Sequence, residues 1–150
     1  MLKMKIWVDA DACPKPVKDI LFRLAERIEI MVTLVANQGM RLPDSPFIKL
    51  IQVGQGADVA DDEIINMCEA GDLIITADIP LAARVVEKEA HALDPRGKVY
   101  DKNNIGQILS MRNFMDELRG SGVETGGPNS FGQKECFKFA NELDKFIAQR

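Results

Sequence analysis

Short apolar segments alternate with segments of helical hydrophobic period along this chain, and this alternation restricts its fold more than any other feature. The apolar segments predict buried strands at residues 5–8, 30–36, 47–53 and 73–76. The helical segments predict helices at about 17–28, 59–70, 78–88, 103–119 and 133–148. Strands that alternate with helices predict an α/β fold in three layers, α/β/α, with helices on both faces of a mainly parallel sheet.

Later segments are less regular. Residues 90–93 and 98–100 fit either late strands or extended connections, with the Asp-Pro-Arg-Gly sequence at 94–97 as a turn between them. Residues 130–133, Ser-Phe-Gly-Gln, have the spacing of a capping box and predict the start of the last helix. Without an internal repeat or a long linker, we expect a single domain over residues 1–150.

Composition excludes several classes of protein. No apolar stretch reaches the about 20 residues that span a bilayer, and Asp9 interrupts the N-terminus before a signal-peptide core, so we expect a cytoplasmic protein with no membrane contact. Cys13, Cys68 and Cys136 form no C-x-x-C pair, and with one histidine, His91, they suggest neither a disulfide framework nor a zinc site. The net charge of -4 gives no general attraction to nucleic acid, although a local basic patch can still bind phosphate.

Aspartates follow the predicted strands at several places. The set comprises Asp9 and Asp11 after the first strand, Asp58, Asp61 and Asp62 at the start of a helix, and Asp78 after the strand at 73–76. Because ligands bind outside the carboxyl ends of parallel strands, we expect these side chains to converge there. Clustered carboxylates repel one another unless their pKa values rise or a divalent cation compensates their charge, and hard oxygen ligands suit Mg²⁺ or Mn²⁺. The pattern therefore indicates metal-assisted phosphoryl chemistry.

Helix capping is the competing explanation for single aspartates, because aspartate is a preferred N-cap and is favoured near a helix N-terminus. It applies best to Asp58 and Asp78, whereas Asp9 directly ends an apolar strand. The sequence does not distinguish Asp61 from Asp62 as a site residue. One of the two is expected only to place a favourable negative charge in the first turn of the helix. The predicted catalytic residues are Asp9, Asp11 and Asp78, and the predicted metal ligands are Asp9, Asp11, Asp58, Asp62 and Asp78.

Other reactive side chains lie near this acidic set. The predicted phosphate-binding residues are Lys15, Lys18 and Arg96, and Arg41 and Arg112 are further cations that could meet phosphate. Cys13 lies close to a helix N-terminus, which favours a thiolate, but the carboxylates beside it oppose one and no activating base is near. We therefore expect Cys13 to pack in the interior and His91 to be structural.

Four ordered motifs resemble the YaiI/YqxD family of uncharacterised bacterial proteins. They are Asp9-Ala10-Asp11-Ala12-Cys13-Pro14, Gly56-Ala57-Asp58-x-Ala60-Asp61-Asp62, Thr76-Ala77-Asp78-Ile79-Pro80-Leu81-Ala82 and Thr125-Gly126-Gly127-Pro128. The resemblance covers nearly the entire chain. The family is in turn distantly similar to PIN-type and NYN-type nucleases, whose strand-end aspartates hold magnesium or manganese for RNA cleavage.

This resemblance implies a PIN-like fold and roles for individual residues. Asp9 and Asp78 match the strand-end acids of those nucleases, and either Asp58 or Asp62 matches the middle acid. The second aspartate of the Asp9-x-Asp11 pair and the following Cys13 belong to the YaiI/YqxD pattern rather than to ordinary PIN domains.

Three functions are consistent with the sequence. The leading hypothesis is a metal-dependent ribonuclease in which the aspartates bind one or two cations that activate a water. The alternative enzyme is a haloacid-dehalogenase-like phosphatase with Asp9 as nucleophile and Asp11 as general acid/base, although that motif normally has Thr or Val at the position of Cys13. The third is a non-catalytic metal-binding or RNA-binding module.

Overall fold

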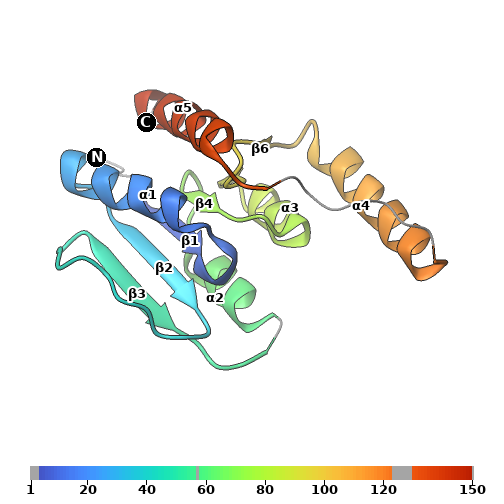
Figure 1. Ribbon diagram of the computed structural model, residues 1–150, viewed down its shortest axis with the longest axis horizontal. Helices are drawn as coiled ribbons and strands as arrows, with labels where there is room; N and C mark the ends of the chain where they lie inside the picture. Colours follow the sequence, from blue (N-terminus) through green and yellow to red (C-terminus); the bar gives the residue numbers. More distant parts are fainter. Residues whose placement is uncertain (1–3, 57, 123–129, 150) are drawn as a thin grey trace.

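The computed structural model describes residues 4–56, 58–122 and 130–149, which form a six-stranded sheet with helices on both faces (Figure 1). The strands are β1 (Ile6–Asp9), β2 (Val32–Ala36), β3 (Ile48–Gln52), β4 (Leu73–Ile75), β5 (His91–Leu93) and β6 (Val99–Tyr100). The helices are η1 (Ala10–Ala12, a 3-10 helix), α1 (Lys15–Ile28), α2 (Val59–Met67), α3 (Ile79–Glu87), α4 (Ile105–Gly120) and α5 (Gln133–Gln149). The predicted α/β class is confirmed. No helix among these residues is long and apolar enough to cross a membrane.

The strand order is β3-β2-β1-β4-β5-β6, and all neighbours are parallel except β5 and β6. Strand β1 is central, with Val8 level with Leu34 on β2 and with Ile75 on β4. The chain builds outward from β1 to β2 and β3, and then crosses to the other side of β1 to form β4. The order therefore reverses between β1 and β4, and in open α/β sheets the crevice at such a reversal is where ligands bind.

Two apolar cores hold the helices to the sheet, because successive residues of a strand point to opposite faces. Val8, Leu34 and Ile75 face the core beneath α1 and α5. Trp7 and Ile74 face the core beneath α2 and α3. The helices contribute Val17, Leu21, Leu24, Phe139 and Leu143 to the first core, and Ala60, Ile64, Leu81, Ala82 and Val85 to the second.

The two segments that the sequence left open are strands, β5 and β6, which form an antiparallel hairpin. Asp94 begins the turn between them, and its Oδ1 accepts a hydrogen bond from the Arg96 N–H at 2.6 Å. Gly97 has a φ of +92°, and a Cβ there would lie 2.8 Å from the carbonyl carbon of Lys138 on α5. The turn therefore needs glycine both for its backbone conformation and for close packing against α5.

Two helix ends differ from the prediction. Helix α2 ends before residue 70, because the backbone of Cys68 is extended with ψ at 154°. The capping box predicted at Ser130 is wrong in register: Gly132 donates its N–H to Glu135 Oε1 at 2.6 Å instead. A side chain in the first turn therefore satisfies a backbone donor at the start of α5, as in one half of a capping box.

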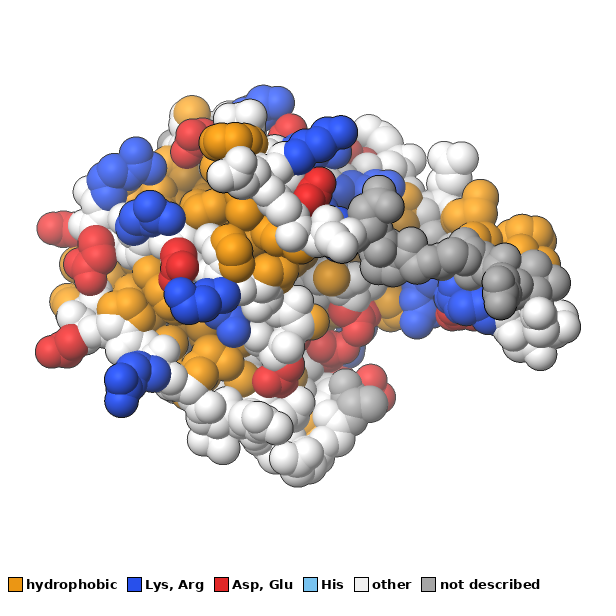
Figure 2. All heavy atoms as spheres, in the orientation of Figure 1, with side chains coloured by type: hydrophobic (Ala, Val, Ile, Leu, Met, Phe, Trp, Pro, Cys, Tyr) orange, Lys and Arg blue, Asp and Glu red, His pale blue; other side chains and the backbone are white. Residues whose placement is uncertain are grey.

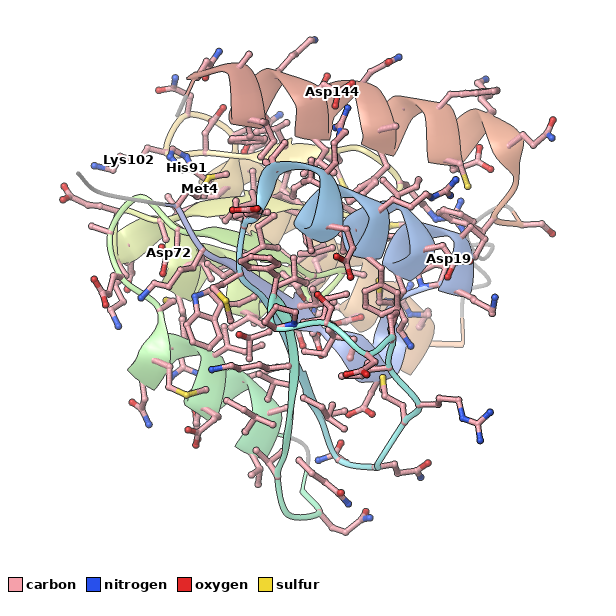
Figure 3. The ribbon with its side chains drawn as sticks, turned by 90° about the vertical axis from the view of Figure 1, so that its left-hand side faces the viewer. Met4, Asp19, Asp72, His91, Lys102 and Asp144 are labelled. Atoms are coloured by element: carbon pink, nitrogen blue, oxygen red, sulfur yellow. The ribbon has the colours of Figure 1, made fainter. Side chains whose placement is uncertain are left out.

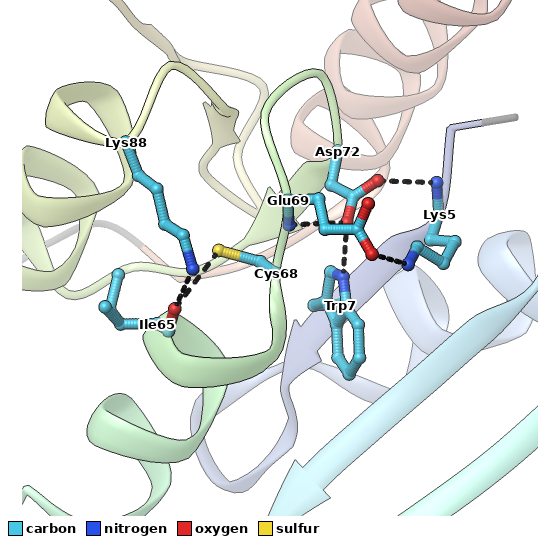
Figure 4. Close-up of polar contacts among 7 residues, drawn as sticks. All are labelled: Lys5, Trp7, Ile65, Cys68, Glu69, Asp72 and Lys88. Atoms are coloured by element: carbon cyan, nitrogen blue, oxygen red, sulfur yellow. Dashed lines mark hydrogen bonds and ion pairs between the residues drawn. The ribbon is translucent and has the colours of Figure 1, made fainter. Parts of the chain in front are cut away.

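A buried carboxylate fixes the amino edge of the sheet (Figure 4). Asp72, only 3% exposed, precedes β4. Its carboxylate accepts hydrogen bonds from the Trp7 indole at 3.0 Å, the Lys5 backbone N–H at 3.1 Å and the Glu69 backbone N–H at 2.9 Å. Trp7 lies on β1, Lys5 directly precedes β1, and Glu69 lies in the loop after α2. Asp72 therefore joins these segments and has the partners that a buried carboxylate requires.

We predict that Asp72→Ala lowers the free energy of unfolding by about 2–3 kcal/mol, because it leaves buried donors without an acceptor. Urea unfolding followed by the fluorescence of Trp7, the single tryptophan, measures this change. The control is Asp144→Ala on α5, an exposed position well away from Asp72 (Figure 3). Equal stabilities of the two variants would contradict this role of Asp72.

Candidate active site at the carboxyl edge

Asp9 ends β1 at the reversal of strand order. Its Oδ2 accepts a hydrogen bond from the Thr76 hydroxyl at 3.0 Å, and Thr76 is a buried residue directly after β4. The same hydroxyl oxygen accepts the Asp78 backbone N–H at 3.0 Å. One threonine thereby joins the two strand-end aspartates that the sequence singled out.

Asp78 is also the N-cap of α3, because its Oδ1 accepts the Leu81 N–H at 2.9 Å. The capping interpretation of this residue is therefore correct as a description of its local structure. Capping uses one oxygen of the carboxylate and holds the side chain beside Asp9 rather than removing it. Among the charged neighbours that raise the pKa of Asp9, Asp78 has the largest effect.

Asp9 is less stable as an anion than an ordinary surface carboxylate. Burial raises its pKa, the hydrogen bond from Thr76 opposes that increase, and the charges of Asp78 and Asp11 raise it further. A carboxylate that is partly removed from water beside other negative charges is a group that a cation would stabilise.

Asp61 on α2 faces the same region. The pKa of Asp61 is raised to about 7, mainly by burial and also by the charges of Asp78, Asp9 and Asp58, while Arg84 opposes the increase. Asp61 thus lies within the electrostatic field of aspartates from three other positions. Its partly buried side chain is the third carboxylate that the fold directs to this edge.

Asp62 has a different environment from its neighbour. It is exposed, and its Oδ1 accepts a hydrogen bond from Arg84 Nη1 at 2.9 Å, which forms an ion pair between α2 and α3. Asp58 is exposed at the N-cap of α2 and makes no side-chain capping bond there. Of the three aspartates near the start of α2, Asp61 is therefore the one coupled most closely to Asp9 and Asp78.

Asp11 connects loops at the same edge. Its Oδ2 accepts the Asn37 backbone N–H at 2.8 Å, and the Asn37 side chain donates to the Gly54 carbonyl at 2.8 Å. These contacts cross the carboxyl ends of β1, β2 and β3. Asp11 is exposed, and in this structure it positions the loop after β2.

The predicted phosphate-binding residues are divided between two places. Lys15 and Lys18 line a groove of about 490 Å³ that also includes Arg41, at the start of α1. Within it, Lys15 forms an exposed ion pair with Asp19 at 3.3 Å. Arg96 lies on the β5–β6 turn, with its guanidinium carbon 5.6 Å from the centre of the Phe131 ring.

Cys13 and His91 have the environments expected of structural residues. Cys13 is buried, and burial raises the pKa of its thiol to about 12, so a thiolate is disfavoured at neutral pH. His91 is at the amino end of β5, with its ring centroid 5.3 Å from that of Phe146.

The donor set suits a hard divalent cation in its chemistry, because Asp9, Asp61 and Asp78 offer carboxylate oxygens and two of them have raised pKa values. Throughout residues 4–56, 58–122 and 130–149, however, no three His, Cys, Asp or Glu side chains are already close enough to share one metal ion. The carboxylates are electrostatic neighbours rather than a complete coordination shell. A cation would have to draw them closer together.

Sequence reasoning missed two features of this edge, the bridging hydroxyl of Thr76 and the position of Asp61. Asp61 lies three residues before the buried Ile64, so both lie on one side of α2, whereas Asp62 is only two residues before it. The adjacent Ile65 makes the phase of this helix ambiguous in the sequence alone. For Thr76, the available signal was its position at the end of a predicted strand, two residues before Asp78. That position could have suggested that its hydroxyl joins the strand-end aspartates.

The fold and the carboxyl edge of the sheet define the class of this protein. It is an α/β protein with carboxylates at the strand ends where the strand order reverses.

The sequence model of the uncharacterised bacterial YaiI/YqxD family matches residues 7–149, so the chain belongs to this family. Similar relatives include UPF0178 proteins of Janthinobacterium sp., 60% identical over 98% of this chain and 97% of the relative, and of Shewanella loihica, 60% identical over 97% of each. No solved structure matches the chain.

We predict that Asp61→Asn stabilises the protein at pH 8 in the presence of a chelator, by on the order of 1 kcal/mol after solvent screening. The pKa of Asp61 is raised from 3.8 to about 7 in the folded protein, so the penalty for its ionisation is complete above pH 7. That penalty disappears as the pH falls towards 4. Urea unfolding at pH 8 and pH 4.5 measures the difference.

The matched control is Asp62→Asn, which removes an exposed ion pair with Arg84 and should change stability by less than about 1 kcal/mol. It should give no gain at pH 8. If Asp61→Asn is no more stable than the wild type at pH 8, or gains as much at pH 4.5, then Asp61 is not in the crowded environment described above.

Proposed function

We propose that this protein is a divalent-metal-dependent nuclease that cleaves RNA in the cytoplasm, with Asp9, Asp61 and Asp78 as its metal ligands. The observation that carries this proposal is the electrostatic coupling of three carboxylates from separate elements, two of which follow β1 and β4 where the strand order reverses. Arg84 opposes the increase in the pKa of Asp61, but its guanidinium is already paired with Asp62. A divalent cation would supply the missing positive charge.

The residues of the chain have distinct tasks in this proposal. Thr76 holds one oxygen of Asp9, and the N-terminus of α3 holds one oxygen of Asp78, so rigid elements orient both carboxylates. Bound Mg²⁺ or Mn²⁺ would supply positive charge to a phosphodiester oxygen and would make water a stronger nucleophile at neutral pH. Lys15 and Lys18, at the start of α1, are available to contact flanking phosphates.

The resemblance to PIN-type and NYN-type nucleases agrees with the roles of Asp9 and Asp78, whereas it matched Asp58 or Asp62 rather than Asp61 to the middle acid. A PIN-like fold stays a prediction. The phosphatase alternative requires Asp11 to act as general acid/base beside Asp9. Asp11 instead accepts a backbone N–H from Asn37 and is exposed, so no contact favours that role. The family membership passes on no substrate, because the family is described as uncharacterised.

We predict that purified protein cleaves a labelled RNA with Mg²⁺ or Mn²⁺ and not with chelator. Asp9→Asn and Asp61→Asn should each lose at least about 100-fold in rate, which corresponds to about 3 kcal/mol of transition-state stabilisation. Asp62→Asn, at the adjacent position, should retain most of the activity and controls for a general effect of substitution in α2, while the loss in the two inactive variants, purified in the same way, excludes contaminating nucleases. Gel electrophoresis of the products measures the rates.

Other outcomes would contradict the nuclease. Hydrolysis of a phosphomonoester with a trapped phosphoaspartate at Asp9 would establish the phosphatase. Metal binding without turnover on any of these substrates would establish a binding module. RNA cleavage that persists in Asp61→Asn and in chelator would show that the activity does not come from this edge.

A further inference from the structure

A groove lies against α4, beside the proposed active site. Helix α4 has no buried residue, and its C-terminal half extends beyond α3 at the right of Figure 1. The groove has a volume of about 610 Å³, and Ile79, Lys98, Arg112 and Arg119 are among the residues that line it. Ile79 directly follows Asp78, so the groove begins next to one of the proposed metal ligands.

The charge of the groove is opposite to that of the acidic edge. Among the described residues that line it, three are basic, Lys98, Arg112 and Arg119, and none is Asp or Glu. One acidic residue of α4, Asp116, pairs with Arg112 at 3.2 Å and with Arg119. Within the described part of the chain, the basic side chains named here outnumber that acidic one, although the net charge of the chain is -4. Such a local excess attracts a polyanion.

The rest of the lining is made of two amide side chains, Asn104 and Gln107, and of apolar residues. Met111 is 57% exposed, and together with Met115 and Ile108 it presents a thioether and aliphatic surface beside the basic residues. Figure 2 shows basic and apolar side chains together on α4, at the right of the view. Thioether sulfur makes favourable contacts with aromatic rings, which include the faces of nucleobases.

These features distinguish between polyanions. A duplex encloses its bases and presents mainly phosphates and groove edges, so it would gain little from an exposed methionine surface. Unpaired bases can lie on such a surface while the backbone phosphates meet the flanking basic residues. The combination therefore fits a single strand.

We propose that the groove formed by α4, the start of α3 and the β5–β6 turn binds single-stranded RNA and leads it to the carboxylates at the carboxyl edge. This inference rests on the proposed function, because it names the form of RNA that reaches the same site. Arg112 on α4 and Lys98 just before β6 contact phosphates, and Met111 contacts a base.

The test measures binding of full-length protein to a fluorescein-labelled single-stranded oligouridylate of about 12 nucleotides by fluorescence anisotropy, at several salt concentrations and with chelator present to prevent cleavage. We expect Arg112→Gln and Lys98→Gln each to weaken binding by about 3-fold to 10-fold, and to reduce the slope of log K against log salt concentration by about 0.7. Met111→Ser should weaken binding with the slope unchanged.

The matched control is Lys49→Gln, an exposed lysine on β3 at the far end of the sheet, which should bind like the wild type. Wild-type affinity in Arg112→Gln and Lys98→Gln, or an equal loss in Lys49→Gln, would overturn the inference. So would sedimentation that shows a dimer dissociated by Met111→Ser with RNA affinity unchanged, since the groove would then bind a second copy.

The chelator separates this inference from the proposed function. Salt-dependent binding that is lost in the groove variants supports the groove even if the wild-type protein cleaves no RNA with metal. Normal binding by the groove variants, with cleavage still dependent on Asp61, overturns the groove and leaves the nuclease proposal intact.

Discussion

The hydrogen bond from the Thr76 hydroxyl to Asp9 is the interaction on which the carboxyl edge depends. It joins the ends of β1 and β4 where the strand order reverses, and through the Asp78 N–H it also sets the start of α3. Helix α3 in turn packs with α2 in the second apolar core. The arrangement keeps a partly buried carboxylate next to others of the same charge, which raises its pKa rather than stabilising its anion.

The two edges of the sheet use buried carboxylates in opposite ways. At the amino edge, Asp72 accepts hydrogen bonds from three N–H groups, so its charge is satisfied within the protein. At the carboxyl edge, Asp9 accepts a hydrogen bond from a hydroxyl, its pKa is raised by burial and by the charges of Asp78 and Asp11, and its own charge raises the pKa of Asp61. The arrangement around Asp72 stabilises the fold, whereas the arrangement around Asp9 is one that a bound cation would complete. Proteins commonly accept unfavourable charge repulsion of this kind at functional sites.

Hydrophobic periodicity predicted most of the fold, because most strands are short apolar runs and most helices bury apolar residues at helical spacing. The segment at 73–76 was predicted as a strand and is β4, and the proline-containing segment from 78 was predicted as a helix and is α3. The alternation of strands and helices predicted the mainly parallel sheet. The early end of α2 at Cys68 and the cap at Gly132 depend on local backbone conformation, which composition does not encode strongly. The choice between Asp61 and Asp62 depended on the phase of α2 against α3, a tertiary contact, and so it could not be made from the sequence.

The most direct test of this account is the affinity of the protein for Mn²⁺, measured by isothermal titration calorimetry at neutral pH. We expect the wild type and Asp62→Asn to bind with similar affinity, and Asp61→Asn to bind at least about 10-fold more weakly, a loss of about 1.4 kcal/mol. This result would place the cation among Asp9, Asp61 and Asp78. If the wild type fails to bind, or Asp62→Asn loses as much affinity as Asp61→Asn, the carboxyl edge is not a metal site of the kind proposed.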